Sequence, residues 1–423
     1  MLINNHQMSK KLNAAVLGSG PLAYDMIRLL NRRSIKTYLL TYKQKLNCNL
    51  YPDTEILKCP SPLNIELFKD IAIFFNENLA VGKNVVLIPA TDEFALFLAQ
   101  KRDQLDKRFQ YVQPNSALTE AIDNKMLFDE LCRQNKIPCP KTVVVRNNSE
   151  FESALQDISF PCIVKPLRTR DWPKFAGFKV RIIKEKEELK SFINELLLHG
   201  CEILIQDMIP GGPETVFFIG GLYDENSNPI KLYVGQKILQ YPLGYGTLCY
   251  GHLKWNDDIV SLANSFIKSI GYSGLIDIEF KYDQRDRTFK MIEINPRNGL
   301  FHSISDDGSW DISSFYVNWI SEAQDIMDNY EAHQEGRKWI YPHVHLYSRI
   351  EERGFFKGIK QWHQDMHLTG LKCEWDTWNI HLCYRHFRVV LGHIRRLGLK
   401  ILISGKNSDV YKDVNFGYSE REK

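Results

Sequence analysis

Two short segments near residue 280 constrain this chain more than any other feature. Ile276–Phe280 (IDIEF) and Lys290–Arg297 (KMIEINPR) both alternate apolar residues with polar ones that include carboxylates, and the stretch between them is polar. The pattern predicts two antiparallel strands joined by a hairpin turn. Because successive side chains of a strand point to opposite faces, Glu293 and Asn295 share a face, and the pairing can bring Glu279 beside them.

These three oxygen-bearing side chains predict a site for a divalent cation. Two carboxylates that lie together on a sheet repel each other unless a cation sits between them. Carboxylate and amide oxygens suit Mg²⁺, which also takes oxygens from phosphates. The alternative is a solvated sheet face with ordinary charge alternation. That alternative explains a single glutamate better than it explains an E-x-N-P-R segment opposite a matching D-I-E-F strand.

Two lysines and a basic loop indicate anion binding. Lys125 opens a predicted helix, and Lys165 ends the apolar strand Cys162–Lys165. A lysine that closes a buried strand loses water, and an anion compensates that loss; a surface lysine with a buried stem is the alternative for each. The following stretch, Leu167–Phe178, includes Arg168 and is expected to form a mobile flap over phosphates. A plain solvated loop remains the alternative there.

The first part of the chain predicts an α/β domain with a parallel, doubly wound sheet over roughly residues 12–115. Strands at Ala14–Leu17 and Thr37–Leu40 flank a glycine turn and a helix, and a buried-type strand follows at Asn84–Pro89. A later helix is expected with Phe94, Leu98 and Leu105 on its apolar face. The Gly18-x-Gly20-x-x-Ala23 spacing is compatible with NAD binding. However, no acidic residue ends the second strand, so a scaffold domain is favoured.

From about residue 120 the pattern changes to α+β with mixed sheets. Ser149 is expected to cap one helix, with Glu152 completing a capping box. The expected helices are Asn124–Asn135, Ser149–Gln156, Glu187–Leu198 and Asp258–Ile270, and the expected strands before residue 210 are Thr142–Val145, Cys162–Lys165, Lys179–Ile183 and Glu202–Gln206.

After about residue 325 the alternation of predicted strands and helices becomes less regular, and this part of the chain carries the excess of basic residues. Residues 331–423 carry 16 Lys+Arg and 11 Asp+Glu, whereas the whole chain has a net charge of +3, too small to predict nucleic-acid binding. Helices are expected near 354–366 and 383–400. The stretch 383–406 resembles a basic amphipathic helix, which we expect to pack on the protein with its basic face in water. Weak contact with anionic lipid or a lipid-linked substrate is the alternative.

Histidines and cysteines give weaker signals. His343 and His345 are expected to share a strand face, and His363 and His367 to be helix neighbours; ordinary packing is favoured over a metal site. The nine cysteines include no C-x-x-C pair, which predicts reduced thiols rather than disulfides or a zinc site. The chain has no run of roughly 18 apolar residues and no apolar signal core near its start, so a cytoplasmic protein is expected.

In this order, the lysines, the flap, a hinge strand (Ile203–Gln206) and the E…E-x-N-P-R pair resemble the ATP-grasp superfamily over about residues 12–320. Within it, Val234–Pro242 (VGQKILQYP) and Pro89–Glu93 (PATDE) are similar to segments of carboxylate–amine ligases related to D-aspartate ligase. The resemblance implies a Rossmann-like pre-ATP-grasp α/β domain (1–118). It also implies a two-lobed α+β ATP-grasp domain (119–325, with lobes 119–206 and 207–325) and a mostly helical C-terminal extension (326–423).

The resemblance also implies roles for single residues. Two positions depart from the family pattern: Gln206 stands where the hinge usually carries Glu, and Leu239 where the G-x-K strand usually carries Arg. The implied roles are ATP contacts for Lys125, Lys165, Arg168 and Lys237, adenine contacts for Gln206 and the backbone of Met208 and Ile209, a ribose contact for Glu214, Mg²⁺ binding for Glu279, Glu293 and Asn295, and catalysis by Arg297 with Lys165.

The implied activity is an ADP-forming carboxylate–amine ligase that works through an acyl phosphate. Its cofactors would be ATP and one or two Mg²⁺, with Mn²⁺ as a substitute. Its partners would be a small carboxylate and a small amine, in cell-wall, surface-polysaccharide or peptide biosynthesis, and a homodimer is compatible with the sequence. Two alternatives stay open: a non-catalytic ATP-binding regulatory module, and an ATP-grasp phosphotransferase or carboxylase.

Overall fold

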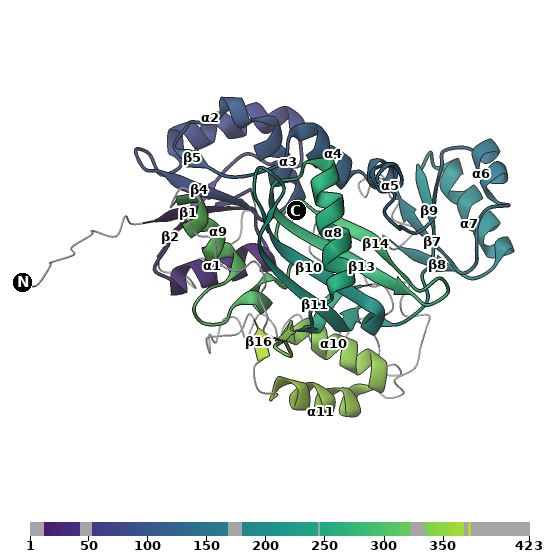
Figure 1. Cartoon of the computed structure of the whole chain (residues 1–423). Helices are drawn as coiled ribbons and strands as arrows, with labels where there is room; N and C mark the ends of the chain where they lie inside the picture. Colours follow the sequence, from purple (N-terminus) through teal and green to yellow (C-terminus); the bar gives the residue numbers. More distant parts are fainter. Residues whose placement is uncertain are drawn as a thin grey trace, which may run out of the picture.

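The computed structural model describes residues 12–42, 53–167, 180–243, 246–321, 335–367 and 371–373. Its strands form a five-stranded, a seven-stranded and a four-stranded sheet within these ranges. The seven-stranded sheet lies in the middle, between the five-stranded sheet on one side and the four-stranded sheet on the other (Figure 1).

The five-stranded sheet is parallel throughout, with the order β3-β2-β1-β4-β5. The expected strands near residues 14, 37 and 84 are all present. One expectation is wrong: α3 ends at Gln100, so Leu105 lies beyond this helix, after a short 3-10 turn. The elements are β1 (Asn13–Leu17), α1 (Pro21–Arg32), β2 (Lys36–Thr41), β3 (Thr54–Lys58), α2 (Phe68–Asn78), β4 (Val85–Pro89), α3 (Asp92–Gln100) and β5 (Phe109–Gln110).

The four-stranded sheet has the antiparallel order β6-β9-β7-β8 and is covered by α6 and α7. The cap of α6 differs from the expectation. Asn147, rather than Ser149, accepts a hydrogen bond from the Glu150 amide, because asparagine caps as well as serine and stands two residues earlier. The elements are α4 (Ser116–Asp123), α5 (Lys125–Gln134), β6 (Thr142–Val145), α6 (Asn148–Ala154), β7 (Cys162–Pro166), β8 (Arg181–Ile183), α7 (Lys186–Leu198) and β9 (Ile203–Asp207).

The seven-stranded sheet has the order β14-β13-β10-β11-β12-β15-β16. Helix α8 covers one face (Figure 1). It begins after the cap residue Asn256 and ends at Gly271, whose φ of 64° suits a glycine. The elements are β10 (Val216–Tyr223), β11 (Pro229–Tyr241), β12 (Thr247–Leu253), α8 (Asp257–Ile270), β13 (Gly274–Asp283), β14 (Thr288–Asn295), α9 (Ile312–Ser321), β15 (Lys338–Ile340), α10 (Pro342–Arg353), α11 (Phe355–Met366) and β16 (Leu371–Cys373).

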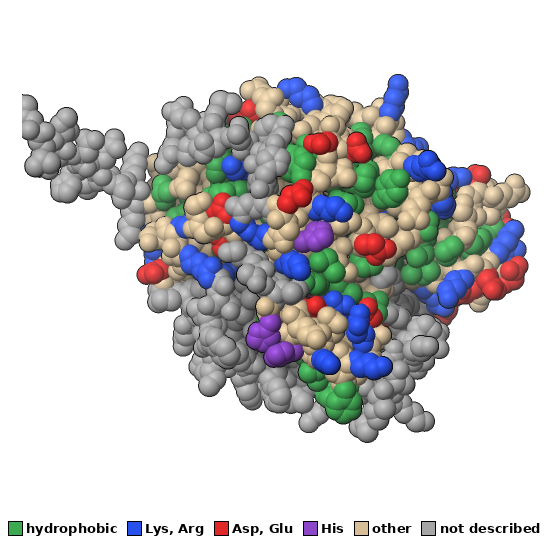
Figure 2. All heavy atoms as spheres, turned by 60° about the horizontal axis from the view of Figure 1, so that its bottom comes forward, with side chains coloured by type: hydrophobic (Ala, Val, Ile, Leu, Met, Phe, Trp, Pro, Cys, Tyr) green, Lys and Arg blue, Asp and Glu red, His purple; other side chains and the backbone are tan. Residues whose placement is uncertain are grey.

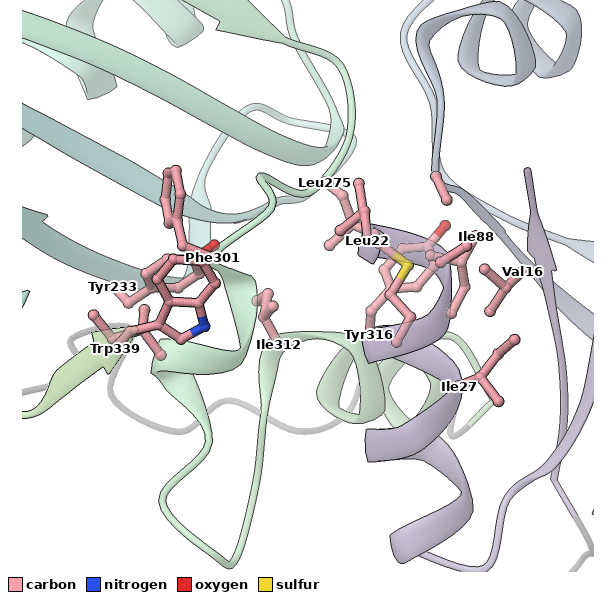
Figure 3. Packing of buried hydrophobic residues seen from close by; sticks show 14 of the residues in the cluster. Val16, Leu22, Ile27, Ile88, Tyr233, Leu275, Phe301, Ile312, Tyr316 and Trp339 are labelled. Atoms are coloured by element: carbon pink, nitrogen blue, oxygen red, sulfur yellow. The ribbon is translucent and has the colours of Figure 1, made fainter. Parts of the chain in front are cut away.

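The opposite face of this sheet shares one apolar core with the N-terminal sheet. Figure 3 shows Leu22 and Ile27 of α1 near Val16 and Ile88, with Tyr316 of α9 beside them. The same cluster continues to aromatic residues over the central sheet. The amide of Val112 also donates a hydrogen bond of 2.9 Å to the Tyr316 hydroxyl. The two sheets are therefore fixed to each other by buried apolar surface.

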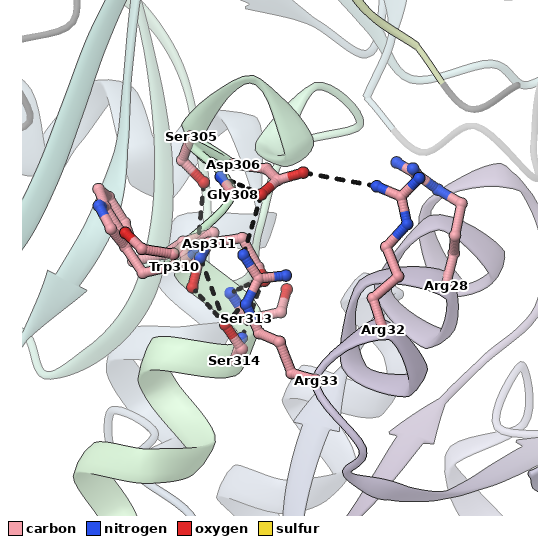
Figure 4. Close-up of polar contacts among 12 residues, drawn as sticks. Arg28, Arg32, Arg33, Ser305, Asp306, Gly308, Trp310, Asp311, Ser313 and Ser314 are labelled. Atoms are coloured by element: carbon pink, nitrogen blue, oxygen red, sulfur yellow. Dashed lines mark hydrogen bonds and ion pairs between the residues drawn. The ribbon is translucent and has the colours of Figure 1, made fainter. Parts of the chain in front are cut away.

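A buried ion-pair network adds to this attachment (Figure 4). Arg33, just after α1, lies 2.9 Å from Asp306 and 2.9 Å from Asp311. The Asp311 side chain is fully buried and also accepts hydrogen bonds from the amides of Ser313 and Ser314, which lie in the first turn of α9. One guanidinium thus neutralises two carboxylates that the loop before α9 brings together.

Replacing Arg33 with alanine should lower the free energy of unfolding by about 3 kcal/mol, because the buried carboxylate of Asp311 would lose its cation. Arg32 is the matched control. It is more exposed and lies 3.6 Å from Asp306, so Arg32→Ala should cost less than about 1 kcal/mol. Urea denaturation of both variants measures the difference. Equal midpoints for the two variants would show that the Arg33 network contributes no special stability.

The described residues after 334 differ in part from the expected helical extension. Helices α10 and α11 are present, but β15 and β16 also join the edge of the central sheet. His343 and His345 lie on α10, not on a strand. The expected basic helix at 383–406 falls outside the described residues.

Figure 2 shows the molecule with the bottom of the Figure 1 view turned forward. Among the described residues on this face, acidic and basic side chains are interspersed. No helix in the described residues is long and apolar enough to cross a membrane.

Candidate functional site

A cavity of about 830 Å³ lies where the three sheets meet. Strands β7 and β9 line it from one side, and β13 and β14 form another wall. The turn before α1 and the first residues of that helix (Ser19–Leu22) also line it, as does the beginning of α10. Its size suits a nucleotide-sized ligand. The cavity collects nearly all the predicted site residues that the structure describes.

The predicted hairpin of carboxylates is confirmed. Strands β13 and β14 pair antiparallel, and Glu279 lies directly opposite Glu293. Lys237 of β11 reaches Glu279, with Nζ 2.7 Å from Oε2. Burial, which removes water from the carboxylate, and the negative charge of Glu279 raise the pKa of Glu293. One lysine therefore faces two adjacent carboxylates, and the pair retains an affinity for a further positive charge.

Asn295 lies in the same row, beside a carboxylate that the sequence analysis missed. Asn295 Nδ2 donates to Asp277 Oδ2 at 3.2 Å, and Asn295 Oδ1 accepts from Arg297 at 3.4 Å. Burial, with the charges of Glu279 and Glu293, raises the pKa of Asp277 to about 8. Strand alternation could have found Asp277, because it stands two residues before Glu279 on the same face.

Arg297 joins the site to the N-terminal sheet. Its Nε lies 2.7 Å from Asp92 Oδ1, and its Nη2 donates to Asp92 Oδ2 at 3.0 Å. Asp92 begins α3, in the P-A-T-D-E loop. The arginine side chain is therefore held in a fixed orientation at the cavity wall.

The two predicted lysines lie close to each other, but only Lys165 lines the cavity; Lys125 lies behind it. Lys125 Nζ donates to the carbonyl of Pro166, next to Lys165. Burial and the charge of Lys125 lower the pKa of Lys165 to about 8. Lys165 donates to Gln206 Oε1 at 3.1 Å, and Gln206 in turn donates to Thr142. A neutral partner at position 206 leaves the lysine charge uncompensated, which favours an anionic ligand.

Of the remaining predicted residues, some line the cavity and others do not. Met208 and Ile209 line the cavity beside Gln206. Glu214 does not line it; this exposed side chain accepts a hydrogen bond of 3.1 Å from the Gly212 amide. Lys281 of β13 also lines the cavity and was not predicted. Arg168 and the flap fall outside the described residues.

Other candidate groups lie away from the cavity. His363 and His367 contact each other at 3.0 Å, and the described residues contain no group of three or more His, Cys, Asp or Glu that could hold a metal ion. Six cysteines are free thiols in the described part of the chain. Leu239, one of the two departures, is buried among apolar residues.

Sequence comparison gives the family of this site. Residues 122–299 match the model of the ATP-grasp domain. The chain contains an ATP-grasp domain. It is 28% identical to the D-aspartate ligase of Enterococcus faecium over 229 residues, which cover 52% of this chain and 54% of that protein. It is 27% identical to the carbamoyl phosphate synthase large chain of Clostridium acetobutylicum over 191 residues, 42% of this chain and 17% of that protein. The chain thus spans about half the length of the D-aspartate ligase.

Solved structures of two other enzymes share the fold over a larger part of the chain. The L-amino acid ligase of Bacillus licheniformis aligns with a TM-score of 0.57 at 15% identity, covering 77% of this chain and 78% of that one. The N5-carboxyaminoimidazole synthetase of Staphylococcus aureus, complexed with ADP, aligns with a TM-score of 0.56 at 13% identity, covering 73% and 77%. At these identities the likeness concerns the fold alone.

Proposed function

We propose that this protein is an ATP-dependent carboxylate–amine ligase. MgATP would supply the phosphoryl group that turns a carboxylate, a poor acyl donor, into an acyl phosphate with a good leaving group. An amine would then displace the phosphate, giving ADP, phosphate and an amide. The D-aspartate ligase of Enterococcus faecium, by its name, acts on an amino acid, and the proposal extends that reaction class to this chain.

The observation that carries the proposal is the direct pairing of Glu279 with Glu293 on a cavity wall that also holds Asn295. These groups fit Mg²⁺ or Mn²⁺, because oxygen ligands of this kind suit hard cations and the two carboxylates are incompletely neutralised. Glu279, Glu293 and Asn295 would hold the metal. A divalent cation there would attract the phosphates of ATP to the same wall.

The other residues would divide the remaining work. Lys125 and Lys165 would bind phosphate oxygens, with Arg168 of the flap, and Lys237 would hold Glu279 in place. Gln206, with the backbone of Met208 and Ile209, would face adenine, and Glu214 would reach ribose only after a change of its side-chain conformation. Arg297, held by Asp92, would stabilise the charge that develops on the acyl phosphate.

The domain organisation follows the same proposal. Residues 1–118 would be the pre-ATP-grasp domain, 119–325 the ATP-grasp domain with lobes 119–206 and 207–325, and 326–423 an extension. The turn before α1 and the start of that helix would form part of the substrate end of the cavity, because Gly20 and Leu22 line it. Leu239, where the family pattern carries Arg, is buried in the apolar core, so an acidic substrate side chain would have no partner at this position.

A screen for phosphate release tests the ligase proposal. The protein would be incubated with MgATP and paired carboxylic and amino acids, and ADP, phosphate and amide products would be quantified. Phosphate release that needs both an acid and an amine supports the proposal. ATP binding without turnover would indicate a regulatory module, and phosphorylated or carboxylated products without an amide would indicate the other ATP-grasp reactions.

The affinity for ATP should fall as the pH rises through about 8, because Lys165 loses its proton there. Below that pH the ammonium can pair with a phosphate; above it the neutral amine cannot, and we expect about tenfold weaker binding. Because bound ATP favours the charged lysine, the pKa of Lys165 is higher in the complex than in the free protein, and the affinity for ATP continues to fall above pH 8. Isothermal titration with a non-hydrolysable ATP analogue measures it. Lys165→Arg, which stays charged, should bind with little pH dependence; an equally steep dependence in that variant would contradict the assignment.

A further inference from the structure

Asp277 is a buried carboxylate on the cavity wall that the proposed chemistry above does not use. The residue is 4% exposed, and it lines the cavity beside Asn295 and Arg297. One oxygen, Oδ2, accepts a hydrogen bond from Asn295. The other, Oδ1, has no hydrogen-bond partner among the described residues. An unpaired carboxylate oxygen in such a place is costly unless a ligand completes it.

The cations around Asp277 are already engaged elsewhere. Arg297 is bound to Asp92, and Lys237 is bound to Glu279. Within the described part of the chain no ion pair reaches Asp277. Oδ1 therefore has no cation or hydrogen-bond donor of its own among the described residues, and a cation bound next to it would stabilise the ionised carboxylate, which burial disfavours.

The surroundings of Asp277 are shaped around its carboxylate. A Cβ at Gly299 would lie 2.8 Å from Asp277 Oδ2, so a larger residue there would displace the carboxylate. The two residues that follow, Leu300 and Phe301, line the cavity. Gly220, opposite Asp277 on β10, leaves space that the Tyr233 side chain fills. The carboxylate thus lies between the polar row of Asn295 and Arg297 and a glycine that leads into two apolar residues of the cavity wall.

We propose that Asp277 binds the ammonium group of the acceptor amine and selects amines whose neighbouring part is uncharged and apolar. The inference rests on the ligase function proposed above. In the transfer, the amine nitrogen forms the new bond to the acyl carbon while the carbon–oxygen bond to phosphate breaks. Of the two protons that the ammonium nitrogen loses, one leaves on the released phosphate and one passes to solvent. Asp277 places the nitrogen next to the acyl group that Arg297 stabilises.

Hydroxylamine separates amine binding from acyl-phosphate formation. It is largely uncharged near neutral pH and traps acyl phosphates as hydroxamates, so it needs no ammonium site. For the acid–amine pair found in the phosphate-release screen, Asp277→Asn should lower kcat/KM for the amine at least about tenfold more than it lowers hydroxamate formation. Asp258→Asn, at an exposed position on α8, is the matched control and should change neither.

A second measurement uses the native protein and so does not depend on the folding of a variant. Butylammonium should compete with the amine substrate or replace it, whereas 1-butanol, which has the same apolar part without the charge, should not. Equal competition by the two compounds would overturn the inference. So would an Asp277→Asn variant whose amine dependence is unchanged, or one whose hydroxamate formation needs more Mg²⁺, because Asp277 would then be a metal ligand. If the native protein forms no hydroxamate with any acid, the ligase proposal itself fails, and the inference fails with it.

Discussion

Replacing Glu293 with glutamine should abolish phosphate release from MgATP. Glu293 lies directly opposite Glu279 on the cavity wall, and the glutamine keeps the shape of the side chain while removing its charge. Loss of a partner that only orients a metal ligand already costs about 10- to 100-fold in metal affinity or activity. Loss of a ligand should therefore cost at least about 100-fold. Glu293→Ala should have the same effect.

The fold of the same variant should be unaffected or slightly more stable. In the absence of metal, Glu293 faces the like charge of Glu279, and its raised pKa shows that the ionised form is disfavoured. A thermal melt of the metal-free protein should thus show no loss of stability while activity disappears. Glu187→Gln, exposed on α7, is the control and should retain activity. Full activity of Glu293→Gln would remove the basis for the metal site.

The central part of the site could be predicted because it depends on local geometry. Alternation along a strand places Glu293 and Asn295 on one face, and a hairpin of this length places Glu279 opposite. The position of Lys165 followed from a lysine at the end of an apolar strand. In each case a few neighbouring residues contain the whole signal.

The rest depended on contacts between distant parts of the chain. The pairing of Arg297 with Asp92 joins residues 205 positions apart, and no local sequence pattern predicts it. β15 and β16 join the central sheet as short edge strands, too short for periodicity to reveal. His343 and His345 alternate as in a strand, but Pro342 occupies the first turn of a helix, where its missing N–H costs nothing, and α10 begins there.

Arg297→Lys should lower kcat at least about 100-fold while the KM for ATP changes little. The lysine keeps the charge, but it cannot hold Asp92 through two nitrogens and reach the acyl phosphate at the same time. Removing one oriented donor from a developing negative charge costs about 100- to 1,000-fold in related cases. Steady-state kinetics with the active acid–amine pair measures the split between kcat and KM.

Two further variants decide what the arginine contributes. Arg353→Lys, at an exposed position on α10, is the matched control and should behave as the native protein. Asp92→Asn keeps Arg297 but weakens its anchor, so kcat should fall by a smaller factor, about tenfold. If Arg297 only attached the N-terminal sheet to the site, Asp92→Asn and Arg297→Lys would lose stability together and retain kcat. A large loss of kcat in Arg297→Lys at native stability would instead place the guanidinium at the reacting group.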